Sequence, residues 1–328
     1  MYLCNPDVIM VSMQDIADRV GVTKSTVSLV LNGKSKGRVS AAVRQKILQE
    51  AESCNFHMNE VARTLRTGKS RVICVLVTDI SNEFFGKLTF HIQEEAKKSG
   101  YMVLIANTNE NDAEMDDAVT TVINRQVDGV IAVPTADCES SLRRLMDAGI
   151  PLVQVDRYYP GIDAPYVGVS NYGAASKAVR SLLDRGSRKI GLVSYDFPVT
   201  ALQERCRGYA DTLREASLYD ESLIHMVGYE NQEAQVDRAV ADLQKECDAI
   251  FFTSRRVFTL GIKALSKEKV RPRLLCFDEV RSYQAVFDGI HSVEQPVETM
   301  GVAAFRLLLE AIDGNPARGQ FIYETTGI

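Results

Sequence analysis

From residue 71 onward the chain alternates short apolar runs with amphipathic segments, and this alternation restricts the possible folds most strongly. The apolar runs have the length of buried strands and lie at 72–77, 102–106, 129–133, 152–155, 189–193, 249–252 and 274–277. Helical patterns separate them at 84–99, 114–125, 142–148, 172–185, 201–216 and 236–243. This order predicts parallel βαβ units with helices on both sheet faces. Because the segment is too long for one regular sheet, we expect two similar α/β lobes with a cleft between them.

The composition is that of an ordinary globular protein of two or three domains, with 328 residues, 45% of them hydrophobic and 25% charged. Its seven cysteines are scattered without C-x-x-C spacing, which favours free thiols in a reducing compartment over disulfides or zinc. No apolar run reaches about eighteen residues, and the N-terminus lacks a secretory-signal layout. We therefore expect a cytoplasmic protein with no membrane span, metal or cofactor.

Residues 11–32 carry the signals of two short helices joined by a tight turn. The spacing of Ser12 and Asp15 is that of a capping box, which starts a helix. Gly21 permits the backbone of a turn, and Thr23 can cap the second helix. This arrangement predicts a helix-turn-helix, whose second helix enters the major groove of DNA. An ordinary surface helix pair is the alternative.

The second of these helices has an inward and an outward face. Val27, Val30 and Leu31 point to one side and are expected to pack. The outward residues are Lys24, Ser25, Ser28, Leu29 and Asn32. A third helix is predicted after a cap at Ser40, with an apolar stripe formed by Val43, Ile47, Leu48 and Ala51.

Charge is divided unevenly along the chain. Residues 1–70 contain ten Lys and Arg against six Asp and Glu, a net charge of +4. The remaining residues contain 28 basic and 37 acidic side chains, a net charge of −9. A basic N-terminal region on an acidic body indicates that only the N-terminal region approaches phosphate.

Polar and aromatic side chains follow four of the strand-like runs, the last of them at 290–293. They are Asp79, Asn82, Phe84 and Phe85 after the first run, Asp156 and Arg157 after 152–155, Asp278 after 274–277, and Gln295 after 290–293. Ligands of parallel α/β sheets bind at these strand ends. Carboxylates, an arginine and an amide beside aromatic rings suit a polyhydroxylated ring. Each residue alone could be a helix cap, a core ring or a surface ion pair, and their recurrence favours a binding site.

Catalytic motifs do not emerge from the sequence. Gly68-Lys69-Ser70 resembles the end of a phosphate-binding loop, but Arg63 occupies the place of the earlier glycine. There is no G-x-G-x-x-G after a strand, no H-E-x-x-H and no G-x-S-x-G, and the four histidines are isolated. Without a nucleophile and base in a recognisable arrangement, we expect a protein that is not an enzyme.

On these motifs the chain resembles the lactose-repressor (LacI/GalR) family of bacterial transcription regulators over nearly its whole length. The residues that carry the resemblance include DIADRVGVTKSTVSLVLNG at 15–33, NEVARTLRTGKSR at 59–71, DISNEFF at 79–85, GIPLVQVDR at 149–157, RCRGY at 205–209, CFDE at 276–279 and VEQPVETMG at 293–301. The resemblance implies an all-α helix-turn-helix headpiece at 10–56 and a hinge helix and linker at 57–70. The core, 71–328, would be two-lobed and periplasmic-binding-protein-like, with doubly wound parallel sheets, an α/β fold.

The resemblance also implies roles for individual residues. Its DNA-binding positions match Thr23, Lys24, Ser25, Thr26, Ser28, Leu29, Asn32 and Leu65. Lys24 and Ser25 occupy the main base-reading positions, and Leu65 matches the hinge leucine that wedges into the minor groove. Its effector-binding positions match Asn82, Phe84, Phe85, Asp156, Arg157, Arg205, Asp278 and Gln295.

Two departures from the family pattern leave alternatives open. Where many members carry a guanine-reading arginine, this chain has Leu29, which could contact a thymine methyl or pack on the headpiece. Where many members carry Asn-Asp, this chain has Arg255 and Arg256 after Ser254. An arginine near the cleft would favour an anionic or phosphorylated effector, whereas an outward arginine would have no such meaning.

Together these observations predict a sequence-specific DNA-binding transcriptional regulator, with repression as its expected action. A single headpiece reads too few bases, so we expect a homodimer on a pseudo-palindromic operator. A small ligand, expected to be a sugar or sugar derivative, would bind between the lobes and change operator affinity. The alternative is a cytoplasmic solute-binding or sugar-sensing protein with little DNA specificity.

Overall fold

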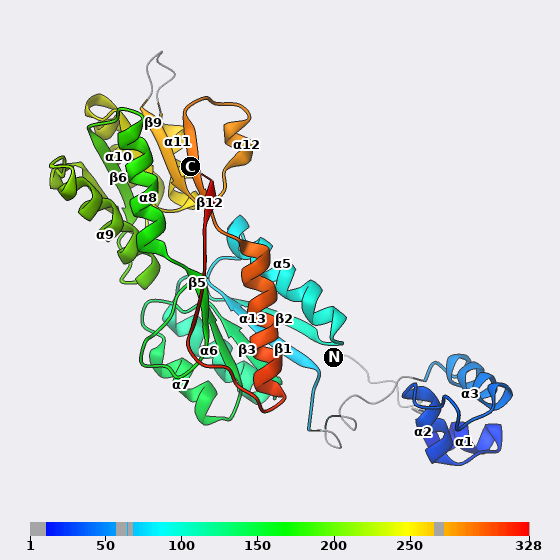
Figure 1. Ribbon diagram of the computed structural model, residues 1–328. Helices are drawn as coiled ribbons and strands as arrows, with labels where there is room; N and C mark the ends of the chain where they lie inside the picture. Colours follow the sequence, from blue (N-terminus) through cyan, green and yellow to red (C-terminus); the bar gives the residue numbers. More distant parts are fainter. Residues whose placement is uncertain (1–10, 57–63, 65–67, 266–271, 328) are drawn as a thin grey trace, which may run out of the picture. The chain divides into compact units, whose positions relative to one another are not determined.

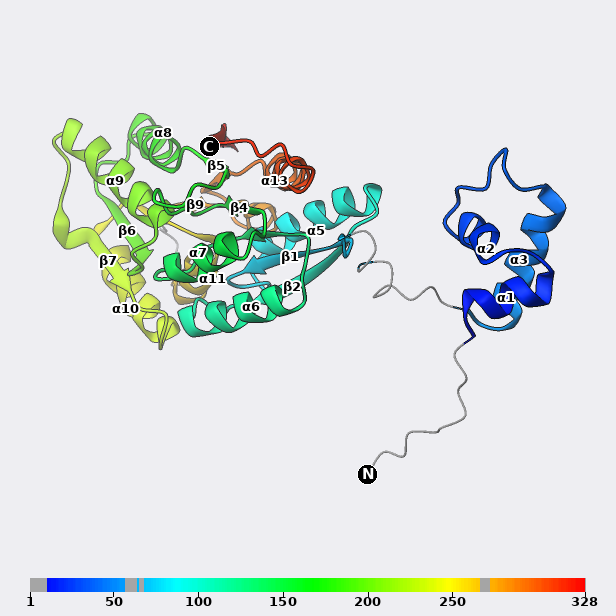
Figure 2. The same cartoon turned by 90° about the horizontal axis from the view of Figure 1, so that it is seen from below.

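The computed structural model describes residues 11–56, 64, 68–265 and 272–327, and the chain divides into two compact units, 1–70 and 71–328. Figures 1 and 2 show the units from two directions. Leu65 and most of the predicted hinge, 57–70, lie outside the described residues. None of the helices in the described part of the chain combines the length and apolar character that a membrane span requires.

The first unit is helical in its described part, with α1 at Met13–Val20, α2 at Lys24–Leu31 and α3 at Ala41–Ser53. The capping box is confirmed, because Asp15 N donates to Ser12 Oγ (3.3 Å) and Ser12 N donates to the Asp15 carboxylate (2.7 Å). Gly21 ends α1 in the left-handed conformation (φ 75°), and the Thr23 side chain caps α2. The helix-turn-helix geometry therefore follows from local hydrogen bonds.

A small apolar cluster holds the three helices together. Its buried members are Ile16, Ala17, Val27, Val30, Ile47 and Ala51. The prediction that Leu48 belongs to this cluster is wrong, since 42% of its surface is exposed. The stripe on α3 follows steps of four residues through Val43, Ile47 and Ala51, and Leu48 lies about 100° further round the helix.

The second unit contains two six-stranded sheets, each the centre of a lobe. The first lobe has strand order β11-β5-β4-β3-β1-β2, with β1 Val72–Val77, β2 Met102–Asn107, β3 Gly129–Ala132, β4 Leu152–Val155, β5 Tyr166–Val169 and β11 Gln320–Tyr323. The second lobe has order β12-β10-β9-β8-β6-β7, with β6 Ile190–Tyr195, β7 Ile224–Val227, β8 Ala249–Phe252, β9 Arg273–Phe277, β10 Ile290–Glu294 and β12 Thr326–Gly327. All neighbouring strands pair in parallel except β12 with β10. The predicted two-lobed α/β core is confirmed.

Helices cover both faces of each sheet. The first lobe carries α5 Glu83–Lys98, α6 Asp112–Asn124, α7 Glu139–Asp147 and α13 Val297–Ile312. The second carries α8 Asn171–Asp184, α9 Thr200–Glu215, α10 Gln232–Glu246, α11 Arg255–Ala264, the short α12 Arg281–Gln284 and a 3-10 turn at Glu221–Leu223. Alternate residues of β1 pack into different clusters, one with α5 and α13 and the other with α6 and α7. This alternation is the pleat of a strand buried on both faces.

The chain crosses between the lobes after β5, after β10 and after β11, since each of these strands is followed by an element of the other lobe. One apolar cluster runs through both lobes, from β1 and α5 of the first to α8, α9 and β9 of the second. Strands β5, β7, β11 and β12 were not among the predicted runs. They are only two to four residues long, so pairing with a neighbouring strand rather than apolar pattern decides them.

Candidate ligand cleft and recognition helix

Two buried aspartates mark the equivalent strand ends of the two lobes. Asp156 follows β4, Asp278 follows β9, and each leaves 7% of its surface exposed. Both have left-handed backbones, with φ of 66° and 91°. Such conformations are uncommon outside glycine and concentrate at functional sites. Burial raises the pKa of both carboxyls, against the opposing pull of Arg205.

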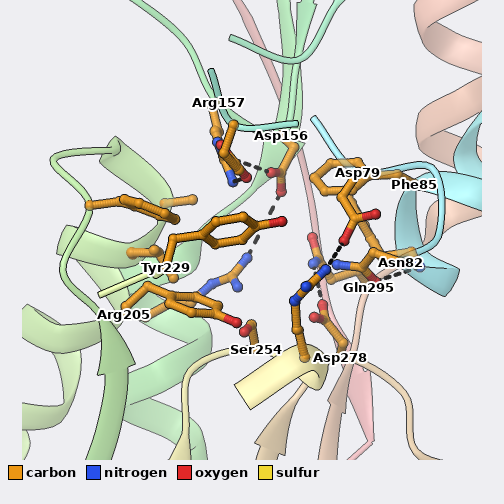
Figure 3. Close-up of a pocket in the computed structure, with 17 residues that line it drawn as sticks. Asp79, Asn82, Phe85, Asp156, Arg157, Arg205, Tyr229, Ser254, Asp278 and Gln295 are labelled. Carbon is orange, nitrogen blue, oxygen red and sulfur yellow. Dashed lines mark hydrogen bonds and ion pairs between the residues drawn. The ribbon is translucent and has the colours of Figure 1, made fainter. Parts of the chain in front are cut away.

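Arg205 of α9 lies beside Asp156, its charge also acts on Asp278, and it is itself 4% exposed. Its Nη2 is 3.9 Å from Asp156 Oδ1, and its guanidinium carbon lies 3.7 Å from the centre of the Phe277 ring. Nε donates to Asn171 Oδ1 (2.8 Å) and Nη1 to the Thr253 carbonyl (2.9 Å). These contacts fix the guanidinium where it can serve acidic groups of both lobes. Figure 3 shows it directed toward Asp156, with Asp278 on the other side of the cavity.

A second buried ion pair lines the first lobe. Both terminal nitrogens of Arg157 donate to the Glu110 carboxylate at 2.7 Å, and both side chains are 10% exposed. This two-point geometry orients the guanidinium and satisfies its charge. Glu110 lies in the loop after β2, where no sequence motif drew attention to it.

Two polar atoms of second-lobe residues that line the cavity lack a partner among the described residues. Gln295 donates from Nε2 to Asp278 Oδ1 (2.7 Å), while its Oε1 is buried without a hydrogen bond. Ser254 Oγ, after β8, is likewise buried and unsatisfied. Because such atoms cost free energy unless they are paired, both suit hydrogen bonds to a ligand. Asn82 caps α5 by accepting from Phe84 N (3.1 Å), so it is a helix cap as well as a cavity residue.

These groups surround one cavity between the lobes. All eight residues predicted for effector binding line it, namely Asn82, Phe84, Phe85, Asp156, Arg157, Arg205, Asp278 and Gln295. Other lining residues are Asp79, Glu110, Tyr195, Phe197, Ala201, Leu202, Tyr229, Ser254 and Arg256. Residues up to 216 positions apart in the sequence therefore meet at this site.

Aromatic rings face the cavity from both lobes. Phe84 and Phe85 of α5 contact each other edge to face, with centroids 5.1 Å apart. On the second lobe Tyr195 stacks on Phe197 at 5.4 Å, and Tyr229 completes the group at 6.0 and 5.7 Å from them. The sequence reasoning missed these three rings. Tyr229 follows β7, a strand that was not predicted, and this hid its strand-end position.

The two arginines that depart from the family pattern have different surroundings. Arg256 lines the cavity, pairs with Asp79 and lies 5.0 Å from the Tyr229 ring centre. The Arg255 side chain pairs instead with Glu83, outside the cavity lining. One arginine thus lies at the cleft, and an acidic partner holds each of them.

In the first unit, seven of the eight predicted DNA-binding residues lie on α2 or at its caps, and Leu65 lies outside the described residues. Thr23 Oγ1 lies 2.9 Å from the hydroxyls of both Ser25 and Thr26. Asn32 donates to the Ser28 carbonyl (2.6 Å) and hydroxyl (3.2 Å), so its amide already has partners within the helix. Lys24 and Ser25 are exposed.

Leu29 is half-buried but belongs neither to the headpiece core nor to the residues packed against it. At 100° per residue it falls beside Ser25 and opposite Val27, Val30 and Leu31. The outward orientation predicted for it is consistent with this placement.

Comparison with known proteins identifies the family to which this architecture belongs. Residues 12–59 match the family model described as bacterial regulatory proteins, lacI family, and residues 73–316 match that of a periplasmic binding protein domain. The chain belongs to the lacI family of bacterial regulatory proteins. The predicted family, fold class and function as a DNA-binding transcriptional regulator with a ligand-binding core are confirmed. Members of this family are regulators rather than enzymes.

Relatives in the family match along nearly their full length. The ribose operon repressor of Halalkalibacterium halodurans is 29% identical over 312 residues, which cover 94% of this chain and 92% of the relative. The transcriptional repressor PurR of Vibrio atlanticus is 28% identical, with 92% of each covered. The structure of the Lac repressor dimer bound to operator superposes with a TM-score of 0.83 at 17% identity, covering 97% of each chain, and so shares the fold.

Proposed function

We propose that this lacI-family regulator is a repressor that binds a pseudo-palindromic operator as a homodimer, and that a sugar or sugar derivative in the cleft sets its operator affinity. The observation that carries the proposal is the convergence of eight anticipated side chains on one cavity between the lobes. We place its action in the cytoplasm, where the bacterial chromosome lies. No catalytic role is proposed.

The lining of the cavity suits a sugar ring. Carboxylates accept hydrogen bonds from hydroxyls, guanidinium groups donate to ring and hydroxyl oxygens, and aromatic faces cover C–H surfaces. Similar proteins point in the same direction: a ribose operon repressor, the regulator CelR in complex with cellobiose, and a LacI transcriptional regulator in complex with D-xylulofuranose.

A ligand in this cavity would contact both lobes. Asp156 and Arg157 belong to the first lobe, and Asp278 and Ser254 to the second, so a ligand that bonds both sets favours one lobe angle. We propose that this angle controls the predicted hinge, 57–70, between the headpiece at 10–56 and the core. By linkage the effector and the operator then change each other's affinity by the same factor.

The edge of the first sheet offers a surface for a second copy of the chain. Strand β2 is an edge strand with Met102 64%, Leu104 37% and Ile105 47% exposed, and Phe90 of α5 is 57% exposed. Exposed apolar side chains along an unpaired sheet edge favour pairing with another chain. They support the homodimer that a two-fold operator requires.

On the DNA side, we propose base contacts from Lys24 and Ser25, further base-edge or phosphate contacts from the remaining α2 residues, and a minor-groove wedge at Leu65. We also propose that Leu29 contacts a thymine methyl, because it lies outside the headpiece core and beside Ser25. Replacing that thymine with uracil, which lacks only the methyl, should weaken binding several-fold in the wild type and not in Leu29→Ala.

Leu65→Ala should weaken operator binding and reduce the bending of the operator DNA, and unchanged bending would contradict the wedge role.

The test of the whole function selects DNA from a random duplex pool with the full-length protein and sequences it. Binding to the selected duplex is then measured with and without a panel of sugars and sugar phosphates. We expect one palindromic motif and at least one compound that changes its affinity. Clean sugar binding without an enriched motif would instead support the solute-sensing alternative.

A further inference from the structure

Three arginines line the cavity, and each already faces a carboxylate. Arg157 is held by Glu110, and Arg205 lies 3.9 Å from Asp156, with its charge also acting on Asp278. Arg256 donates from Nη1 to Asp79 Oδ2. Four carboxylates thus face three guanidinium groups within the cavity lining. Arginine alone would suggest an anionic ligand, but the lining as a whole offers no cation that lacks an acidic neighbour.

The pair of Arg256 and Asp79 joins the two lobes, as the contact of Arg205 with Asp156 also does. Arg256 lies in the first turn of α11 in the second lobe, whereas Asp79 follows β1 in the first lobe, so the bridge spans the cleft. It is also the least buried of the three, with Arg256 35% and Asp79 15% exposed. Both residues line the cavity and also an outer groove that continues past Ser81 and Tyr283. The bridge therefore lies where an entering ligand meets the cavity.

Further contacts fix both partners. Asp79 Oδ1 accepts from the backbone N–H of Ser81 at 3.0 Å, which leaves Oδ2 for Arg256. Arg256 Nε donates to Gln232 Oε1 at 3.1 Å, and its guanidinium lies over the Tyr229 ring. Arg256 would keep its contacts with Gln232 and Tyr229 if Asp79 lost its charge.

We propose that Asp79 is a specificity-determining residue that makes the cleft select uncharged effectors over phosphorylated or carboxylated ones. An anionic ligand that approaches Arg256 either displaces Asp79 and breaks this bridge, or binds with the Asp79 carboxylate still beside it, and like-charge repulsion opposes both arrangements. A neutral sugar pays none of these penalties. The inference rests on the proposed function, that a sugar binds in this cavity.

The variant Asp79→Asn isolates the charge. Asparagine keeps the size of the side chain and an oxygen for Ser81 N, and it leaves Arg256 without its carboxylate. We expect the ratio of anion affinity to neutral-sugar affinity to rise about tenfold or more, because a charge-assisted hydrogen bond to the ligand becomes available. Arg256→Gln and the double variant Asp79→Asn/Arg256→Gln should show no such gain.

The experiment measures dissociation constants of the full-length proteins by calorimetry at constant ionic strength. The probes are ribose with ribose 5-phosphate, glucose with glucose 6-phosphate, fructose with fructose 6-phosphate, and inorganic phosphate alone. Asp163→Asn is the matched control, since it removes a carboxylate from an exposed pair with Arg318 outside the cavity. We expect the wild type to prefer the neutral member of each pair that binds, and Asp163→Asn to behave like the wild type.

Two results would overturn the proposal: a wild type that prefers the phosphorylated member, or an Asp79→Asn variant whose ratio is unchanged. If the bridge only holds the lobes together, Asp79→Asn and Arg256→Gln will weaken neutral and anionic probes alike. Failure of the proposed function looks different, because no sugar would then bind the wild type. Inorganic phosphate still tests the charge effect in that case, as Asp79→Asn should bind it more tightly than the wild type does.

Discussion

The headpiece and the cleft differ in how their recognition residues are distributed along the chain. The headpiece presents its proposed contacts on one helix, α2, where Lys24 and Ser25 are exposed and Thr23 caps the first turn. The cleft collects its contacts from loops between Asp79 and Gln295, and its central charges are almost fully buried. A change in the headpiece should therefore act on few neighbours, whereas a change in the cleft disturbs a connected set of ion pairs.

The largest expected effect is in the cleft. Arg205→Ala should destabilise the core by about 4 kcal/mol, because it leaves Asp156 buried without the guanidinium beside it and removes the positive charge that acts on Asp278. Urea unfolding in the absence of effector, followed by tyrosine fluorescence, measures this loss of stability. Arg214→Ala, which removes a pair with Asp211 on the exposed side of the same helix, is the control and should cost at most about 1 kcal/mol. Equal losses in both variants would contradict the central role of Arg205.

In the headpiece, Ile47→Ala should cost about 3 kcal/mol, since it opens a cavity in a core with only six buried residues. Operator binding should be lost while effector binding to the core persists. Leu48→Ala, on the same helix but 42% exposed, is the matched control and should change stability little. Circular dichroism during thermal unfolding measures the stability of the headpiece, and calorimetric titration with a sugar that binds the wild type measures effector binding. Loss of effector binding in Ile47→Ala would show that the two regions are not separable.

Lowering the pH should decrease the folding stability that the headpiece gains from Asp15 and increase the stability that the core gains from Asp156 and Asp278. Hydrogen bonds from Ser12 lower the pKa of Asp15, so the capping box contributes stability above the ordinary value of about 3.8 and loses it only as the pH falls through the lowered value. Burial raises the pKa of Asp156 and Asp278, so the folded cleft takes up protons at higher pH than an ordinary aspartate, and this uptake favours the folded state.

Effector affinity should consequently decline by up to about tenfold per pH unit for each proton taken up below those raised pKa values, while the headpiece remains folded. Calorimetric titration with a sugar that binds, at a series of decreasing pH values, measures the decline, and circular dichroism follows the headpiece. An affinity that stays constant until the headpiece unfolds would mean that the ligand does not use the two carboxylates in their ionised form.

The smallest effect is expected where the cleft is most exposed. Lys87 of α5 pairs with Glu279 of the second lobe at 3.1 Å, with 41% and 31% of the side chains exposed. Lys87→Gln should change stability by less than about 1 kcal/mol, and its effect should disappear in 0.5 M salt. Lys98→Gln, which loses an exposed pair within one helix, provides the comparison. A large and salt-independent effect of Lys87→Gln would show that this bridge dominates contact between the lobes.

The sequence by itself determined the elements and much of the site. Capping hydrogen bonds act over three residues and apolar periodicity over one or two turns, so the helices of the headpiece and the longer strands could be predicted locally. The strand-end rule then identified Asp156, Asp278 and Gln295 as residues of one site. The error at Leu48 also has a local origin, since one extra apolar residue beside a true stripe carries no sign of its exposure.

Only the tertiary structure decided which charged groups meet. Asp79 and Arg256 are 177 residues apart, and Glu110 reaches Arg157 from a loop 47 residues away. In the sequence, Arg256 could lie near the cleft and favour an anionic ligand, or point outward and have no such meaning. Its net effect depends on the carboxylate that lies beside it. That neighbour is set by how two sheets and the crossings between them bring distant loops together, which no local pattern encodes.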